Sequence, residues 1–271
     1  MKLYFRKLGR GEPLVILHGL YGSSDNWFTF GKILSKFYEV YLIDLRNHGR
    51  SPRSDEHSYK LMIQDMAELF EQQQLEKAVV MGHSMGGKTA ILFALRYPSK
   101  VSKLVVVDAS PKSYENDPYI ADQIRLHKSI VAALSNFDVT AVQSREDADK
   151  ALAKEIPNTR IRLFLLKNLK RDPKGQYFWT LNVKVIAQNL ENILNDFDSD
   201  LWKGVDTPHN FPALFIKGQL SDYLLESDKS KILELFPNAS IKTIPGAGHW
   251  VHAEQPELFI SVLLKFLQPD T

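Results

Sequence analysis

The chain has 271 residues, of which 44% are hydrophobic and 24% are charged, and its formal net charge at pH 7 is +2. This composition is typical of a folded globular protein, and so small a charge argues against nucleic acid as the main partner. The chain contains no cysteine, so disulfides, thiolate metal sites and a cysteine nucleophile are excluded. No apolar stretch is long enough to span a bilayer, and the first residues do not fit a secretory signal, so we expect a cytoplasmic protein without a membrane partner.

Short apolar runs alternate with helical patterns, which predicts parallel strands joined by crossover helices. The segment 2–8 alternates apolar and polar residues and is predicted to be an edge strand. The strands predicted after it are 13–17, 39–44, 77–82, 103–108, 213–218 and 240–244. Helices are predicted at 59–74, at 84–97, where Pro98 should end the helix, and from Pro256 onward.

The stretch 111–210 differs from the rest of the chain because it has helical patterns and no convincing strand. Loops at the carboxyl ends of parallel strands carry function in such folds, so a helical insertion here should cover the site. We therefore expect a core formed by 1–110 and 211–271, with a helical cap formed by 111–210.

The strongest motif is the G-x-S-x-G of residues 82–86, which follows a predicted buried strand and opens a predicted helix. This is the context of a nucleophile elbow, in which a strained turn exposes a serine hydroxyl at a helix N-terminus. Ser84 is therefore the candidate nucleophile. The same segment, extended to Thr89, also satisfies the P-loop pattern, but a nucleotide site would leave the glycine-containing motifs at 18–22 and 245–250 unexplained.

A serine hydroxyl is a weak nucleophile until a base removes its proton, and the base should lie late in the chain. Gly246 and Gly248 permit a loop after the last predicted strand that brings His249 over the edge of the sheet. His249 is therefore the candidate base. His252 is the alternative, and we interpret it more simply as a surface or capping residue.

The oxyanion of an acyl-transfer reaction is expected to bind backbone N–H groups, one of them from the residue after the nucleophile. That residue is Met85, and Leu20, in the loop after the strand at 13–17, is the candidate for the second donor. The His18 imidazole is expected to brace this loop. No HExxH or carboxylate cluster indicates a metal site.

Together these motifs resemble the α/β-hydrolase family, and the segments 44–51, 82–88 and 246–254 are similar to the YbfF-type esterases. The similarity covers nearly the whole chain and is weakest between about 112 and 158. It implies an α/β-hydrolase fold, with a mostly parallel central sheet, helices on both faces and a helical cap inserted before the penultimate strand. It also implies hydrolysis of small-molecule carboxylic esters or thioesters, acyl-CoA among them, through an acyl-serine intermediate and without a cofactor.

The triad acid is the point at which the sequence departs from the commonest hydrolase pattern. That pattern places the acid after the strand at 213–218, where this chain has Ser221, and Asp222 follows one residue later. The YbfF-type esterases resemble this chain in a D-x-x-P at the end of the preceding strand, which makes Asp108 the acid. Because the acid has only to hold and stabilise the histidine ring, either position could serve. We favour Asp108 and keep Asp222 as the alternative.

Two other kinds of function are compatible with these motifs. A C–C bond hydrolase or a cofactor-free perhydrolase could share the triad, and a non-catalytic ligand-binding protein could share the fold. In an acyl hydrolase, the aromatic residues of the insertion would either line an acyl pocket or pack the cap against the core. These residues are Tyr114, Tyr119, Phe178, Trp179 and Trp202.

Overall fold

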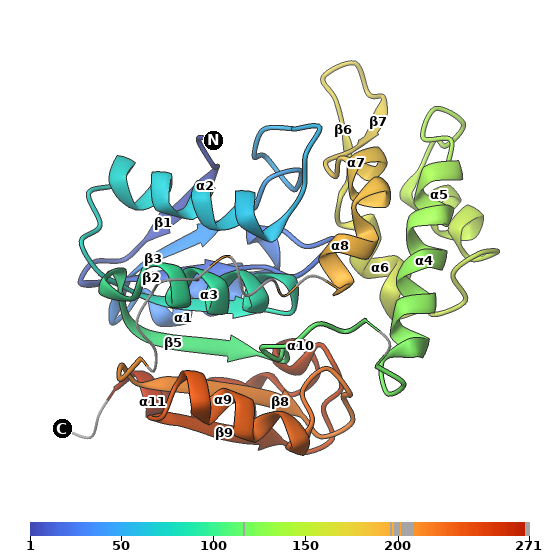
Figure 1. Cartoon of the computed structure of the whole chain (residues 1–271). Coiled ribbons are helices and arrows are strands. Elements are labelled where there is room, and N and C mark those ends of the chain that lie inside the picture. The colour runs from blue at the N-terminus through green and yellow to red at the C-terminus, as the bar shows by residue number, and fades with distance from the viewer. Residues whose placement is uncertain (116, 196, 198–200, 202–208, 269–271) are drawn as a thin grey trace.

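The computed structural model describes residues 1–115, 117–195, 197, 201 and 209–268. Its core is a seven-stranded sheet in the order β1-β3-β2-β4-β5-β8-β9 (Figure 1). The edge strand predicted near the start of the chain is confirmed as β1, and all neighbouring strands are parallel except β1 and β3. The strands are β1 Phe5–Leu8, β2 Glu12–Leu17, β3 Tyr38–Ile43, β4 Ala78–His83, β5 Val101–Val107, β8 Ala213–Gly218 and β9 Ala239–Ile244.

Helices cover both faces of this sheet, as the continuous apolar strands predicted. Successive residues of a strand point to opposite faces. Val15 and Leu17 of β2 therefore pack into one apolar cluster, whereas Leu14 and Ile16 pack into another. The first cluster includes residues of α2 Tyr59–Gln72, α3 Met85–Arg96 and α9 Lys229–Leu235, and the second includes residues of α1 Phe28–Leu34 and α11 Pro256–Leu267.

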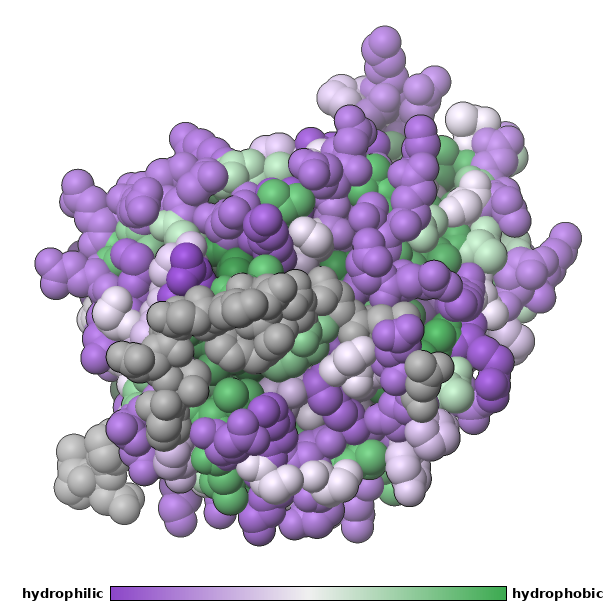
Figure 2. All heavy atoms as spheres, in the orientation of Figure 1, coloured by the Kyte–Doolittle hydropathy of each residue, from purple (hydrophilic) through white to green (hydrophobic). Residues whose placement is uncertain are grey.

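Short elements and caps complete this core. The short helices are η1 Ser24–Trp27, η2 Pro98–Lys100, η4 Glu226–Asp228 and α10 Val251–Glu254. The Ser58 side chain accepts the Leu61 N–H at the start of α2, and Pro256 lies in the first turn of α11. Hydrophilic side chains cover much of the face seen in Figure 2. None of the helices in the described ranges is both long enough and apolar enough to cross a bilayer.

Between β5 and β8 the chain leaves the sheet and forms a mostly helical layer beside the carboxyl ends of the strands (Figure 1). Its elements are α4 Ala121–Asn136, α5 Arg145–Leu152, α6 Thr159–Leu166, β6 Leu169–Arg171, β7 Tyr177–Trp179, α7 Val183–Gln188 and α8 Leu190–Asn195. The prediction that this stretch contains no strand is wrong, because β6 and β7 pair as an antiparallel hairpin. Strands of three residues are too short to produce a recognisable alternation.

Candidate active site

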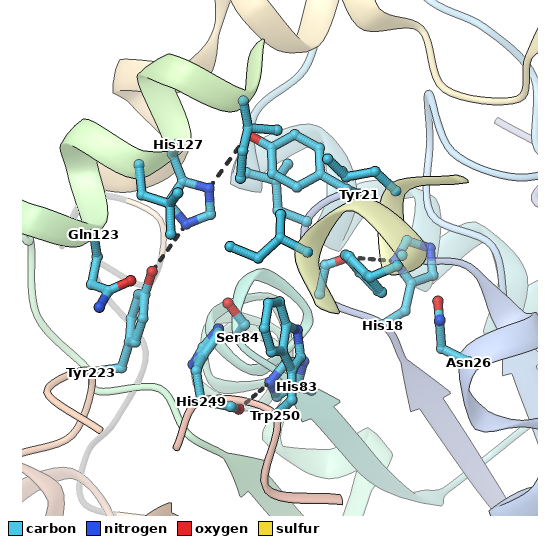
Figure 3. Close-up of a pocket in the computed structure, with 18 of the residues that line it drawn as sticks. His18, Tyr21, Asn26, His83, Ser84, Gln123, His127, Tyr223, His249 and Trp250 are labelled. Carbon is cyan, nitrogen blue, oxygen red and sulfur yellow. Dashed lines mark hydrogen bonds between the residues drawn. The ribbon is translucent and has the colours of Figure 1, made fainter. Parts of the chain in front are cut away.

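Ser84 lies in the turn between β4 and α3, with a φ of 54° and a ψ of −119°. A residue other than glycine rarely adopts a positive φ, and such a conformation costs on the order of 1–3 kcal/mol. The turn is held by the Ser84 N–H, which donates to the carbonyl of Val107 at 3.0 Å, and by the Ser84 carbonyl, which accepts the Lys88 N–H at 2.9 Å. This strained geometry points the hydroxyl toward a cavity (Figure 3).

The two glycines of the motif are required by close approaches of the backbone. A Cβ on Gly82 would lie 2.0 Å from the carbonyl oxygen of Gly86, and a Cβ on Gly86 would lie 2.5 Å from that of His18. The helix that follows Ser84 therefore packs directly against the loop after β2. A Cβ on Gly19, in that loop, would lie 3.2 Å from the Ser84 Cβ, so the loop passes beside the serine.

Asp108 and His249 are far apart in the sequence and meet at the carboxyl edge of the sheet. His249 Nδ1 lies 2.7 Å from Asp108 Oδ2. The same carboxylate accepts hydrogen bonds from the Ser221 hydroxyl and, at 3.1 Å, from the Gly218 N–H. Asp108 is completely buried, whereas Asp222 is exposed. The structure thus brings Asp108 to the His249 ring and leaves Asp222 at the surface.

Burial controls the protonation of this pair. It lowers the pKa of His249 to about 3, so the imidazole is neutral at pH 7 and can accept a proton. Burial also raises the pKa of Asp108 to about 7, while the hydrogen bonds from Ser221 and Gly218 oppose that shift by favouring the carboxylate. An Asp108 oxygen at Nδ1 favours the tautomer that carries its hydrogen there, which leaves Nε2 as the acceptor.

Ser84 and His249 both line a cavity of about 270 Å³ between the sheet edge and the helical layer (Figure 3). Leu20 lines the same cavity, and Met85, the first residue of α3, lines a smaller adjoining pocket that Ser84 and Leu20 also border. The predicted nucleophile, base and oxyanion residues therefore lie around two adjoining pockets that share Ser84 and Leu20. The apolar side chains of the cavity wall include Leu126, Ile130, Ile161 and Leu165.

The aromatic residues that line this cavity are not those considered from the sequence. Tyr114 lines the smaller pocket. Tyr119 and Phe178 are 66% and 40% exposed, and Trp179 is buried against Phe137, so these three do not line the cavity. Trp202 lies outside the described residues. The aromatic residues that do line the cavity are Tyr21, Trp27, Phe164, Tyr223 and Trp250.

Two residues that hold the His249 loop were not predicted from the sequence. The Glu254 carboxylate accepts the N–H groups of Gly248 and Trp250, at 3.0 and 3.2 Å, on either side of the histidine. His83 Nε2 lies 2.9 Å from the carbonyl oxygen of His249. Both residues lie within motifs that the sequence analysis recognised, and this was the only sequence signal for them. Their spacing in the chain does not specify the contacts that they make.

His252 and His18 are both buried in the structure. The interpretation of His252 as a surface or capping residue is wrong, because its ring stacks on Trp27 with centroids 4.2 Å apart. The contacts of His18 fit the expected bracing of its loop, since its Nε2 accepts the Leu45 N–H at 3.0 Å. A second brace was not predicted: His48 Nε2 accepts the Tyr21 N–H at 3.2 Å.

The chain is similar in sequence and in structure to several known proteins. A family profile described as alpha/beta hydrolase fold matches residues 12–256. The chain is 39% identical, over 96% of its length and 80% of the relative's, to a Danio rerio protein named sn-1-specific diacylglycerol lipase ABHD11. It is 32% identical to Esterase YbfF of Escherichia coli strain K12, over 94% of this chain and 93% of that protein. A solved structure titled "Marine microorganism esterase" matches with a TM-score of 0.91 and 46% identity, covering 98% of this chain and 99% of the other.

Proposed function

The chain belongs to the alpha/beta hydrolase fold family, and on that premise we propose that it is a carboxylesterase-type serine hydrolase that cleaves carboxylic esters or thioesters. One observation carries the proposal: the strained Ser84 and the neutral His249 line a single cavity, and the buried Asp108 carboxylate contacts the His249 ring from outside it. The relatives described above are named as esterases or lipases, which supports the same class of reaction.

In the proposed mechanism, Ser84 attacks the carbonyl carbon of the ester while His249 Nε2 takes the hydroxyl proton. Asp108 holds the imidazole and stabilises the imidazolium that forms. The N–H groups of Met85 and Leu20 donate to the oxyanion, and the N-terminus of α3 favours its negative charge. His249 then gives its proton to the leaving alcohol or thiol. Water, activated by the same histidine, hydrolyses the acyl-serine intermediate.

We further propose that residues 111–210 form a cap over this site and that 1–110 and 211–271 form the core. Leu126 and Ile130 of α4 and Ile161 and Leu165 of α6 line the cavity, which supports a place for an acyl chain between the cap and the core. A cytoplasmic location and a small-molecule substrate, with no nucleic acid or membrane partner, remain predictions from the sequence.

Covalent labelling tests the proposed nucleophile. A fluorophosphonate probe should label the wild-type protein at Ser84, as located by peptide mass spectrometry, and should leave Ser84→Ala unlabelled. Since the triad acts as a unit, Ser84→Ala should lower kcat on p-nitrophenyl and CoA esters by on the order of 10⁴-fold or more. Equal labelling of both proteins, or labelling at another serine, would show that Ser84 is not the nucleophile.

A further inference from the structure

Three side chains that the proposed mechanism does not use form a polar cluster on the wall of the cavity (Figure 3). His127 of α4 lies between Tyr223, in the loop after β8, and Tyr21, in the loop after β2. His127 Nε2 is 2.9 Å from the Tyr223 hydroxyl oxygen, and His127 Nδ1 is 3.4 Å from that of Tyr21. We call these residues the Tyr–His–Tyr cluster. All three border the cavity that also contains Ser84 and His249.

This cluster has more hydrogen-bond donors than it can satisfy through hydrogen bonds among its own three side chains. Burial lowers the pKa of His127 to about 3, so its ring is neutral at pH 7, with one N–H donor and one acceptor nitrogen. The ring can therefore accept a hydrogen bond from only one of the two phenols. In either tautomer, the other phenol can bond the ring only by accepting its N–H, and the O–H of that phenol stays unused within the cluster.

The unused O–H belongs to a phenol that is nearly inaccessible to bulk solvent. Tyr21 and Tyr223 are 3% and 4% exposed, yet both side chains border the cavity. A buried donor without an acceptor is unfavourable, so the cluster favours a ligand that places an oxygen in front of it. Tyr223 also stacks on the His249 ring, with centroids 3.9 Å apart, which places that phenol beside the proposed catalytic base.

The charge of the cavity indicates what kind of oxygen would bind. Its described lining includes no Lys or Arg side chain, and Glu254 supplies the one carboxylate. Lys88 borders only the smaller pocket, which His127 and Tyr223 also border. There its Nζ lies 3.7 Å from the centroid of the Tyr114 ring and donates to the carbonyl of Leu194. A carboxylate or phosphate would thus enter the larger cavity without a cation lining it, whereas an uncharged oxygen needs only the O–H donor.

We propose that the Tyr–His–Tyr cluster is a substrate-binding subsite that donates a phenol O–H to an uncharged oxygen of the ester, remote from the bond that is cleaved. The oxygen can be that of a ketone, an ether or a hydroxyl group. The subsite makes oxygen-bearing esters better substrates than their hydrocarbon analogues of the same length. This inference rests on the proposed ester hydrolysis and adds the class of ester.

Matched substrate pairs test the subsite. On the acyl side, p-nitrophenyl levulinate is compared with p-nitrophenyl pentanoate, and on the alcohol side, methoxyethyl butanoate is compared with butyl butanoate. Each kcat/KM is divided by the rate constant for hydroxide-catalysed hydrolysis, which removes differences in intrinsic reactivity. One added neutral hydrogen bond should make the oxygen-bearing member of at least one pair a better substrate by about threefold to tenfold.

Tyr21→Phe/Tyr223→Phe removes both hydroxyls and keeps both rings, so it should bring this ratio close to unity. The ratio does not depend on the fraction of folded enzyme, because a general loss affects both substrates equally. Tyr41→Phe is the matched control, since its hydroxyl bonds Glu39 at 2.7 Å and does not line the cavity. It should keep the wild-type ratio.

A wild-type enzyme with no preference in either pair would overturn the subsite, and so would a preference that survives in the double variant. These results differ from failure of the proposed function. In that case neither member of a pair would be hydrolysed and the fluorophosphonate probe would not label Ser84, which would overturn both proposals together.

Discussion

The Asp108 carboxylate accepts hydrogen bonds from the His249 ring, the Ser221 hydroxyl and the Gly218 N–H. Asp108→Asn replaces one acceptor oxygen with a donor NH₂ while keeping the shape of the side chain. The ring is then no longer held in the tautomer that leaves Nε2 free to accept the serine proton. We expect kcat on a p-nitrophenyl ester to fall by roughly 10²–10⁴-fold.

Asp222→Asn is the matched control because the side chain is exposed. Its kcat should stay within about tenfold of the wild-type value, since surface substitutions have small effects. If instead Asp222→Asn lost more activity than Asp108→Asn, Asp222 would be the triad acid. The contact between Asp108 and His249 would then be structural.

At the scale of elements, α6 and the β6–β7 hairpin lie in the same proposed cap but differ in their relation to the cavity. Phe164 of α6 lines the cavity, whereas Trp179 of β7 packs within the helical layer against Phe137. Phe164→Ala should shift the ratio of kcat/KM for p-nitrophenyl octanoate over butanoate, because it enlarges the space for an acyl chain. Trp179→Ala should leave this ratio unchanged and lower the free energy of unfolding by about 3–5 kcal/mol.

Denaturant titration measures the loss of stability in each variant, and the octanoate to butanoate ratio of kcat/KM measures the change in acyl-chain preference. A changed ratio in Trp179→Ala together with an unchanged ratio in Phe164→Ala would mean that the hairpin, rather than α6, shapes the acyl pocket.

Elements with strong local patterns were predictable from the sequence. The parallel strands are apolar runs bounded by turn residues, and the predicted strand at 213–218 has the same bounds as β8. The elbow at 82–86 was recognisable because its tight backbone contacts leave no alternative to glycine at fixed spacing. The close approach of Asp108 and His249 did not follow from spacing and was anticipated from the place of Asp108 at the end of a strand together with the family resemblance.

Contacts among distant elements could not be predicted in this way. Tyr21, His127 and Tyr223 come from two loops and a helix, and no fixed spacing relates them. For a similar reason the sequence could not decide which aromatic residues of the insertion line the pocket and which pack the cap. Aromatic composition does not indicate which side of a short element faces the cavity, and Trp179 illustrates this because it turns into the packed layer.

At the scale of the whole molecule, burial keeps most histidines neutral. The pKa is lowered to about 4 for His18 and to about 3 for His48, His83, His127 and His249, and it lies well below its usual value for His57 and His252. Below pH 6.5 the unfolded chain therefore binds protons that the folded chain does not. Since the free energy of unfolding rises with pH wherever the unfolded state binds more protons, it should fall steeply as the pH decreases from about 6.5 toward 4.

Each such histidine contributes up to about 1.4 kcal/mol per pH unit, and Asp108 opposes them because its folded pKa is raised. His57 is the simplest to remove, because neither of its ring nitrogens has a hydrogen-bond partner in the described part of the chain. The free energy of unfolding can be measured by urea denaturation at several values between pH 8 and pH 5. Plotted against pH, it should have a shallower slope for His57→Leu than for the wild type. A free energy of unfolding that stays flat below pH 6.5 in the wild type would contradict this account.

The backbone of Ser84 has a further consequence for how the chain evolves. Its positive φ is unfavourable for serine and free of strain for glycine. Ser84→Gly should therefore stabilise the fold by about 1 kcal/mol while abolishing the proposed chemistry. A lineage selected for stability alone would drift toward glycine at this turn. Under the proposed mechanism, selection for the reaction of the hydroxyl is what would keep a serine in so costly a position.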